Sequence, residues 1–163
     1  MELLALDNRV LFIGQTVGYG GSRFTKDLET MENSKKIELP VIEEMQMGIS
    51  TGLALEGFIP VSIYPRFDFL LLAANQLVNH LDKMKELSQG QFDPKVIIRT
   101  VVGSRDPYPG PQHCKDHTDA FRLMLTNVYI KKLTKLEEIV QEYKAALKRK
   151  QSSLLIEIGD LYI

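Results

Sequence analysis

The sequence predicts an α/β fold: a doubly wound, mostly parallel sheet of about six strands with helices on both faces. Short apolar runs of strand length alternate along the chain with longer segments that have helical spacing. These runs are apolar throughout, which is typical of parallel strands covered on both faces. No repeat, low-complexity tract or linker divides the chain, so residues 1–163 are expected to form one domain.

Each expected element follows from its local composition. Strands are expected where aliphatic and β-branched residues cluster: Val10 to Gly14, Lys36 to Leu39 (the weakest), Pro60 to Tyr64, Lys95 to Val101, Val128 to Lys132 and Ser153 to Ile158. Helices are expected where apolar residues recur every three to four positions: Thr25 to Met31, Glu43 to Glu56, Asp68 to Leu87, Asp116 to Leu125 and Lys135 to Lys148. Right-handed crossovers between these strands give the doubly wound arrangement.

The helix expected from Glu43 to Glu56 is unusual because it contains two glycines. Each glycine inside a helix costs about 1 kcal/mol relative to alanine. Gly48 and Gly52 are four residues apart and share one face, so they indicate close packing or a flat ligand. Gly57 is expected to cap the end of the helix. Tight packing on the sheet explains the glycines but not the acidic residue where the helix begins.

Composition excludes several classes of function. The chain is 44% hydrophobic and 25% charged, with a formal net charge of -1, so it does not favour nucleic acid or an anionic membrane as a partner. No apolar run approaches the roughly 20 residues of a membrane span, and the first residues lack the pattern of a signal peptide. Cys114 is the single cysteine, which excludes an intrachain disulfide and makes the cytoplasm the expected location.

In a sheet of this kind, ligands bind in the loops that follow the strands. The first such loop, GQTVGYGGSRF, contains Gly18, Gly20 and Gly21 and resembles a phosphate-binding turn. Arg23 occupies the place of the third glycine of a dinucleotide fingerprint, so a tight turn is the better interpretation. In the loop after Tyr64, Phe67 and Phe69 suit either core packing or stacking on a heterocycle, and Asp68 is a candidate helix cap.

The third loop, VGSRDPYPGPQHCKDHTDAF, combines prolines, glycines and histidines in a stretch without regular pattern. His113 and His117 are four residues apart, which raises the possibility of a metal site near Cys114. Without a second cysteine or another cluster, we expect no metal ligands. A general acid or base is the better use of His113.

Five motifs in order resemble one family: VLFIGQTVGYGGSRF, PVIEEMQMGISTGLALEGFIPV, FDFLLLAANQLVNHLDKM, SQGQFDPKVIIRTVVG and GPQHCKD. The chain from about Val10 to Ile158 is similar to the pyrimidine-binding domain of transketolase-like thiamine diphosphate enzymes. Within that group it most resembles the beta subunit of pyruvate dehydrogenase-type enzymes, which decarboxylate 2-oxoacids. The resemblance implies the thiamine diphosphate-binding fold and thiamine diphosphate with magnesium as cofactors.

The resemblance also implies roles for single residues. Glu43, five positions before Gly48, matches the acidic residue that hydrogen-bonds the aminopyrimidine ring; Glu44 ranks second because it breaks this spacing. A carboxyl group there favours the imino tautomer, which removes a proton from the thiazolium carbon. Phe69 matches the aromatic side chain against that ring, with Pro65 at a neighbouring contact. His113 matches the histidine directed at the substrate, and Gln15 occupies a cofactor-contacting place that is usually acidic.

Two features of the family are absent from this sequence. The Gly-Asp-Gly motif that holds the diphosphate and magnesium has no match, since Leu161 follows Gly159 and Asp160. The resemblance therefore implies an alpha-type partner subunit that holds the magnesium ion, and two such heterodimers associated as a heterotetramer. The second absence is the carboxyl-terminal domain of such beta subunits.

Two functional hypotheses follow. If Ile163 is the natural end, we expect a compact two-subunit enzyme that decarboxylates a 2-oxoacid and transfers the acyl carbanion to a small acceptor. If the protein continues further, oxidative decarboxylation is favoured. The alternative is a non-catalytic or regulatory relative that only pairs with an alpha-type subunit. The retention of Glu43, Phe69 and His113 argues against this alternative.

Overall fold

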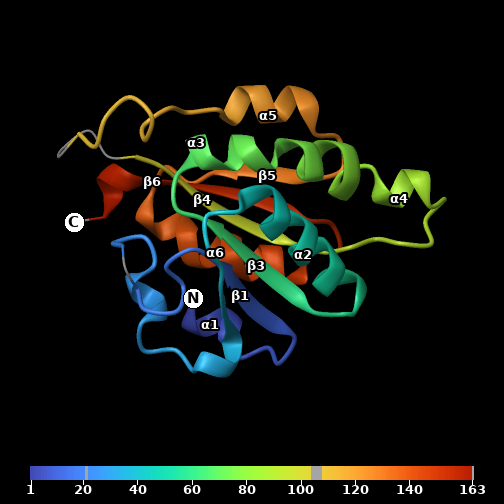
Figure 1. The fold of residues 1–163 in the computed structure, drawn as a ribbon, viewed down its shortest axis with the longest axis horizontal. Coiled ribbons are helices and arrows are strands. Elements are labelled where there is room, and N and C mark those ends of the chain that lie inside the picture. The colour runs from blue at the N-terminus through green and yellow to red at the C-terminus, as the bar shows by residue number, and fades with distance from the viewer. Residues whose placement is uncertain (21, 104–107, 163) are drawn as a thin grey trace.

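The computed structural model describes residues 1–20, 22–103 and 108–162. Its six strands form one parallel sheet with the order β2-β1-β3-β4-β6-β5 (Figure 1). The strands are β1 (Val10–Gly14), β2 (Lys36–Glu38), β3 (Ile59–Tyr64), β4 (Ile97–Val102), β5 (Tyr129–Lys132) and β6 (Ser153–Ile158). The predicted fold class is confirmed, and all the pairings are parallel rather than most of them.

Helices cover both faces of the sheet (Figure 1). On one face, Met47 of α2 (Glu43–Leu55), Phe67 of α3 (Phe67–Leu70) and Phe121 of α5 (Thr118–Met124) pack into one core. On the other face, Leu4 of α1 (Glu2–Ala5) and Tyr143 of α6 (Leu136–Lys148) pack into a second core. The strands of the middle of the sheet are buried by both cores, which explains their continuous apolar sequence.

Two expected helices differ from the structure. The segment Thr25 to Met31 contains only the short 3-10 turn η1 (Lys26–Leu28). Lys36 Nζ donates to the Leu28 carbonyl oxygen at the end of this turn and to the Gly18 carbonyl oxygen in the preceding loop. Two further 3-10 turns, η2 (Asn33–Lys35) and η5 (Gly159–Leu161), were not expected.

The long helix expected from Asp68 to Leu87 is broken into four pieces. They are α3, the 3-10 turn η3 (Leu71–Ala73), the π-helical η4 (Gln76–Leu81) and α4 (Met84–Leu87). Leu70, Leu77 and Leu81 are nonetheless buried, as their spacing predicts. Apolar spacing therefore identified the buried face correctly but did not reveal the change of hydrogen-bonding pattern along the segment.

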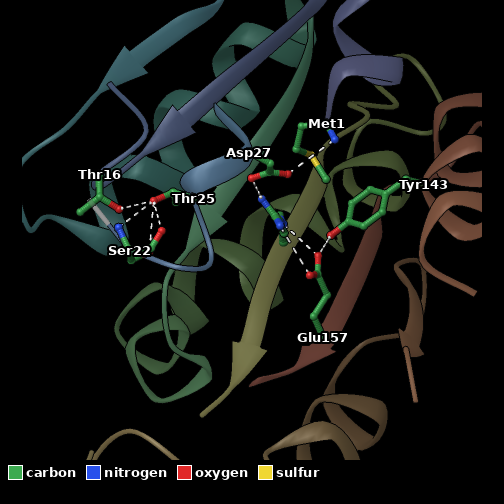
Figure 2. Close-up of polar contacts among 8 residues, drawn as sticks. Met1, Thr16, Ser22, Thr25, Asp27, Tyr143 and Glu157 are labelled. Carbon is green, nitrogen blue, oxygen red and sulfur yellow. Dashed lines mark hydrogen bonds and ion pairs between the residues drawn. The ribbon is translucent and has the colours of Figure 1, made fainter. Parts of the chain in front are cut away.

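A buried ionic network crosses the sheet beneath α6. Arg99 of β4 donates from Nε to Glu157 Oε1 on the neighbouring strand β6 at 2.9 Å, and its Nη1 lies 3.2 Å from Asp27 Oδ1. Figure 2 shows Tyr143 donating to the same Glu157 carboxylate. Burial opposes the charge on Arg99, but Glu157, Tyr143 and Asp27 together raise the pKa of its guanidinium. The network fixes β4 against β6.

Among the described residues, no helix is long and apolar enough to cross a membrane.

Candidate functional site

The site begins where β1 ends and α2 starts. Gln15 directly follows β1, and Glu43 is the first residue of α2. The Glu43 side chain is buried, with 4% of the residue exposed, and its Oε1 accepts a hydrogen bond from Gln15 Nε2 at 3.1 Å. The structure thus brings together two residues that lie 28 positions apart in the sequence and that were predicted to contact one cofactor.

Buried polar side chains hold α2 in this position. Gln46 is fully buried, and its Nε2 donates to the Ile63 carbonyl oxygen at 2.9 Å and to Ser62 Oγ at 3.1 Å. Ser50, one turn further along α2, donates to the same Ser62 hydroxyl at 3.0 Å. Sequence reasoning missed this anchor. The sequence feature that could have revealed it is Ser62, a polar residue inside an otherwise apolar strand.

Tyr64, the last residue of β3, also contacts Glu43. Its hydroxyl donates to the Glu43 backbone carbonyl oxygen at 3.2 Å. Burial, together with the nearby Glu43 charge, raises the pKa of the Tyr64 hydroxyl, although a hydrogen bond with Ser62 opposes this shift. Tyr64 therefore stays protonated and fixes the first turn of α2 against the end of β3.

A second pair of predicted residues meets beyond β3. The rings of Phe69 and His113 lie edge to face, with centroids 5.4 Å apart and planes at 77°. His113 Nδ1 is buried and has no hydrogen-bond partner among the described residues. Pro65 directly follows β3 and precedes α3. Gln15 and Pro65 thus lie at the carboxyl ends of β1 and β3, and His113 lies in the loop after β4.

The loop that carries His113 is pressed against the end of β4. A Cβ atom added to Gly103 would lie 2.0 Å from the His113 carbonyl oxygen, so only glycine fits at this position. Residues 104–107 of this loop, like Gly21 of the first loop, lie outside the described residues.

The histidines of the third loop do not converge. His113 faces Phe69, whereas His117 Nε2 lies 3.1 Å from Asp68 Oδ1. No group of three or more His, Cys, Asp or Glu side chains that could hold a metal ion occurs among the described residues. The interpretation of Asp68 as a helix cap is wrong, because α3 has no side-chain cap and the Asp68 carboxylate contacts the third loop.

The glycine-rich first loop is a tight turn held by a carboxylate. Glu38 accepts hydrogen bonds from the backbone N–H groups of Thr16 at 2.8 Å and Gly18 at 2.6 Å. These amides are the donors that a phosphate would need, so they favour the turn over a nucleotide site. Thr16 has a φ of 61°, a backbone conformation uncommon for a residue with a side chain.

An open groove of about 780 Å³ lies beside Glu43. Its lining residues come from α2, the segment before it, and the broken helix: Ile42, Glu43, Glu44, Met45, Gly48, Ile49, Leu72 and Gln76. Glu44 lies at its exposed rim, where Oε1 accepts from Asn75 Nδ2 at 3.2 Å. A Cβ on Gly48 would meet only Gln76 Oε1 at 4.0 Å, and one on Gly52 would meet nothing within 4 Å. The expected close packing of these glycines is therefore not found within the chain.

These residues fit a flat heteroaromatic ring with polar edges. Glu43 offers a buried carboxyl group for a ring nitrogen, and Phe69 offers an aromatic surface. The unpartnered Nδ1 of His113 is a buried polar atom that a substrate or cofactor group could satisfy. The donor set suits an aminopyrimidine, which has both ring nitrogen acceptors and an exocyclic donor.

No family model matches the chain. It is 35% identical over 105 residues to the beta subunit of the pyruvate dehydrogenase E1 component of Cyanidium caldarium, a match that covers 63% of this chain and 32% of that protein. It is 32% identical over 123 residues to the beta subunit of 3-methyl-2-oxobutanoate dehydrogenase of Mycobacterium tuberculosis, covering 74% of this chain and 35% of that protein. The matched region is thus about a third of the length of these relatives.

Two solved structures share the fold. A split-gene transketolase, described as an inactive beta4 tetramer, matches 95% of this chain and 47% of its own with a TM-score of 0.73 and 16% identity. A transketolase from Campylobacter jejuni matches 94% of this chain and 23% of its own, with a TM-score of 0.71 and 22% identity. At these identities the likeness establishes the fold alone.

Proposed function

We propose that this chain, which has a transketolase-like fold and is related to beta subunits of 2-oxoacid dehydrogenases, is the pyrimidine-binding domain of a two-subunit thiamine diphosphate-dependent enzyme. The enzyme decarboxylates a 2-oxoacid and transfers the acyl group to an acceptor. The observation that carries the proposal is Glu43: a buried carboxylate at the mouth of α2, held by Gln15 beside an open groove.

Each residue has a distinct part in this proposal. Thiamine diphosphate, when bound, would supply a nucleophilic thiazolium carbon and a cationic ring that takes up the electrons released on decarboxylation. Glu43 shares a proton with a ring nitrogen of the aminopyrimidine, and Gln15 keeps its carboxylate oriented. Phe69 and Pro65 lie against the ring. His113 donates a proton to the substrate oxygen or stabilises the charge that develops there.

The proposal requires a partner subunit. The relatives are named as beta subunits, which supports an alpha-type subunit that holds the diphosphate and its magnesium ion. The groove beside Glu43 is open to solvent and exposes Met45 and Leu72, which suits a cofactor bound between two subunits. Two heterodimers then form a heterotetramer. The single cysteine supports a cytoplasmic location, although a rice relative is described as chloroplastic.

A non-catalytic or regulatory role is the second candidate. It is favoured by Gln15, which by the family resemblance occupies a place that is usually acidic. A subunit of this kind would pair with an alpha-type subunit without contributing to chemistry.

Calorimetric titration of thiamine diphosphate and magnesium tests the proposal. The cofactor is titrated into this chain alone and into its mixture with the alpha-type protein encoded nearest to it. We expect binding in the mixture and none with this chain alone, and 2-oxoacids are then screened for decarboxylation. If a stable mixed complex forms but binds no cofactor, the non-catalytic role is the better account.

A further inference from the structure

Among the described residues, no hydrogen bond to Nδ1 of the His113 imidazole fixes the orientation of the ring, and the ring lies edge to face with Phe69. Contacts to the rest of the loop therefore help to set where His113 lies. On one side Gly103 blocks movement, because the His113 carbonyl oxygen lies against it.

Asp68 holds the loop from the opposite side. Its Oδ2 accepts a hydrogen bond from the Lys115 backbone N–H at 3.3 Å, and its Oδ1 lies 3.1 Å from His117 Nε2. A carboxylate only accepts hydrogen bonds, so Nε2 of His117 carries the proton. The Asp68 and His117 side chains are 14% and 12% exposed, so this contact is largely shielded from water.

Three consecutive residues of α3 thus contact the loop that carries His113 and His117. Phe67 contacts the His117 ring edge to face at 5.5 Å and stacks on Phe121 at 5.4 Å. Asp68 binds the backbone and His117, and Phe69 contacts His113. Since α3 packs on the sheet through buried Phe67, the loop is tied to a rigid part of the fold.

We propose that Asp68 is a positioning residue that, through His117 and the Lys115 amide, holds the His113 loop against Phe69. The effect of this contact on turnover rests on the proposed role of His113. The contact itself, and the position that it gives to His113, do not depend on that role. Because a displacement of about 1 Å costs on the order of 100-fold in rate, a side chain remote from the chemistry can control it.

Proton–carbon correlation spectra of the imidazole groups provide a direct test. The chain has three histidines, and the third, His80, is exposed and serves as an internal reference. The difference between the spectra of the parent protein and Phe69→Leu gives the chemical-shift displacement that the Phe69 ring causes in the His113 signals. In Asp68→Ala we expect the His113 signals to lose this displacement and move toward those of His80, while the His80 signals stay unchanged.

Paired variants separate positioning from a general loss of structure. His117→Gln keeps an N–H donor near Asp68 and should retain the His113 displacement, whereas His117→Leu should lose it. Asp119→Ala removes an exposed carboxylate of α5 that pairs with Arg122 and should change nothing. Unchanged His113 signals in both Asp68→Ala and His117→Leu would overturn the proposal, as would their loss in His117→Gln.

Turnover is measured separately in the complex with the alpha-type subunit. In Asp68→Ala we expect kcat to fall roughly 10- to 100-fold. Cofactor affinity should stay within about twofold, because the Glu43 and Gln15 contacts are not altered. A displaced His113 without a fall in kcat would confirm the positioning and reject the proposed role of His113.

Discussion

At the scale of single residues, a substitution of Glu43 tests the proposed chemistry most directly. Glu43→Gln preserves the side-chain volume and can still accept the hydrogen bond from Gln15, but it no longer shares a proton with the pyrimidine ring. We expect turnover in the mixed complex to fall by about 10²- to 10⁴-fold, with assembly unchanged. The measurements are kcat and sedimentation of the complex.

The neighbouring Glu44 supplies the matched control. It is exposed at the groove rim, so Glu44→Gln should leave most of the activity. Full activity of Glu43→Gln, or an equal loss in both variants, would remove Glu43 from the mechanism.

Asp82 gives the chain a pH-dependent stability. Burial alone would raise the pKa of this carboxyl group, but N–H donors of Asn127 and Thr126, the Thr126 hydroxyl and Lys83 hold it below its usual value. A lowered pKa means that the folded state binds the proton less tightly than the unfolded state. The stabilisation is therefore fully present above the unfolded pKa and is lost as pH falls through the folded pKa.

Urea unfolding of Asp82→Asn between pH 7 and pH 3 tests this. At pH 7 we expect the variant to be less stable by about 1–3 kcal/mol, because buried N–H donors lose a charged acceptor. The difference should narrow below about pH 4, where the unfolded carboxyl group of the parent protein becomes protonated. Asp119→Asn, with a side chain 92% exposed, is the control. A difference that stays constant with pH would contradict the assignment.

How far single residues were predictable depended on where their partners lie. The roles of Glu43, Gln15, Phe69 and His113 come from the family resemblance and stay predictions, although the structure does bring Gln15 to Glu43 and Phe69 to His113. Asp68 was misinterpreted as a cap because its partners, Lys115 and His117, are more than 40 positions away. Gln46 was missed because a glutamine inside a helix looks like a surface residue until the strand it contacts is known.

At the scale of elements, close packing among the described residues does not require either glycine of α2. Gly52 is exposed and has an ordinary helical conformation, and a Cβ there would meet nothing within 4 Å. We expect Gly52→Ala to stabilise the isolated chain by about 0.5–1 kcal/mol, since alanine has less freedom to lose on folding. Urea unfolding measures the change.

Gly57 provides the contrast. It also has open space around it, but its φ of +90° disfavours any side chain, so Gly57→Ala should destabilise the chain. A loss of stability in Gly52→Ala would show that the helix cannot accept a side chain there. If Gly52→Ala stabilises the chain but weakens binding of the alpha-type subunit, the glycine face serves the interface.

Strands were more predictable than helices at this scale. Burial on both faces makes the strands in the middle of the sheet largely apolar, and β1 and β6 begin and end at the residues expected. In the segment from Phe67 to Leu87, apolar spacing is compatible with α, 3-10 and π turns alike. Which of them forms depends on packing against the sheet and on Asp82, which binds the chain before β5.

At the scale of the whole molecule, the fold class was predictable because apolar runs of strand length alternate with helical segments, whereas the strand order β2-β1-β3-β4-β6-β5 was not predicted. How the chain assembles with a partner was not predictable, because the apolar groove beside Glu43 does not by itself identify the protein that covers it. Leu72 lies in this groove with 62% of its surface exposed, opposite Met45 at 60% on α2. Exposed apolar side chains beside a buried carboxylate are expected at a site completed by a second subunit.

Leu72→Glu tests whether the groove is that interface. Because Leu72 is mostly exposed, the free energy of unfolding of the isolated chain should change by less than about 0.5 kcal/mol. Affinity for the alpha-type subunit should fall at least about tenfold, since a charge would be buried without a partner. Leu123→Glu, on α5 outside the groove and 89% exposed, is the control and should bind normally. Equal affinity of the two variants would contradict the proposal that this groove is the interface with the alpha-type subunit.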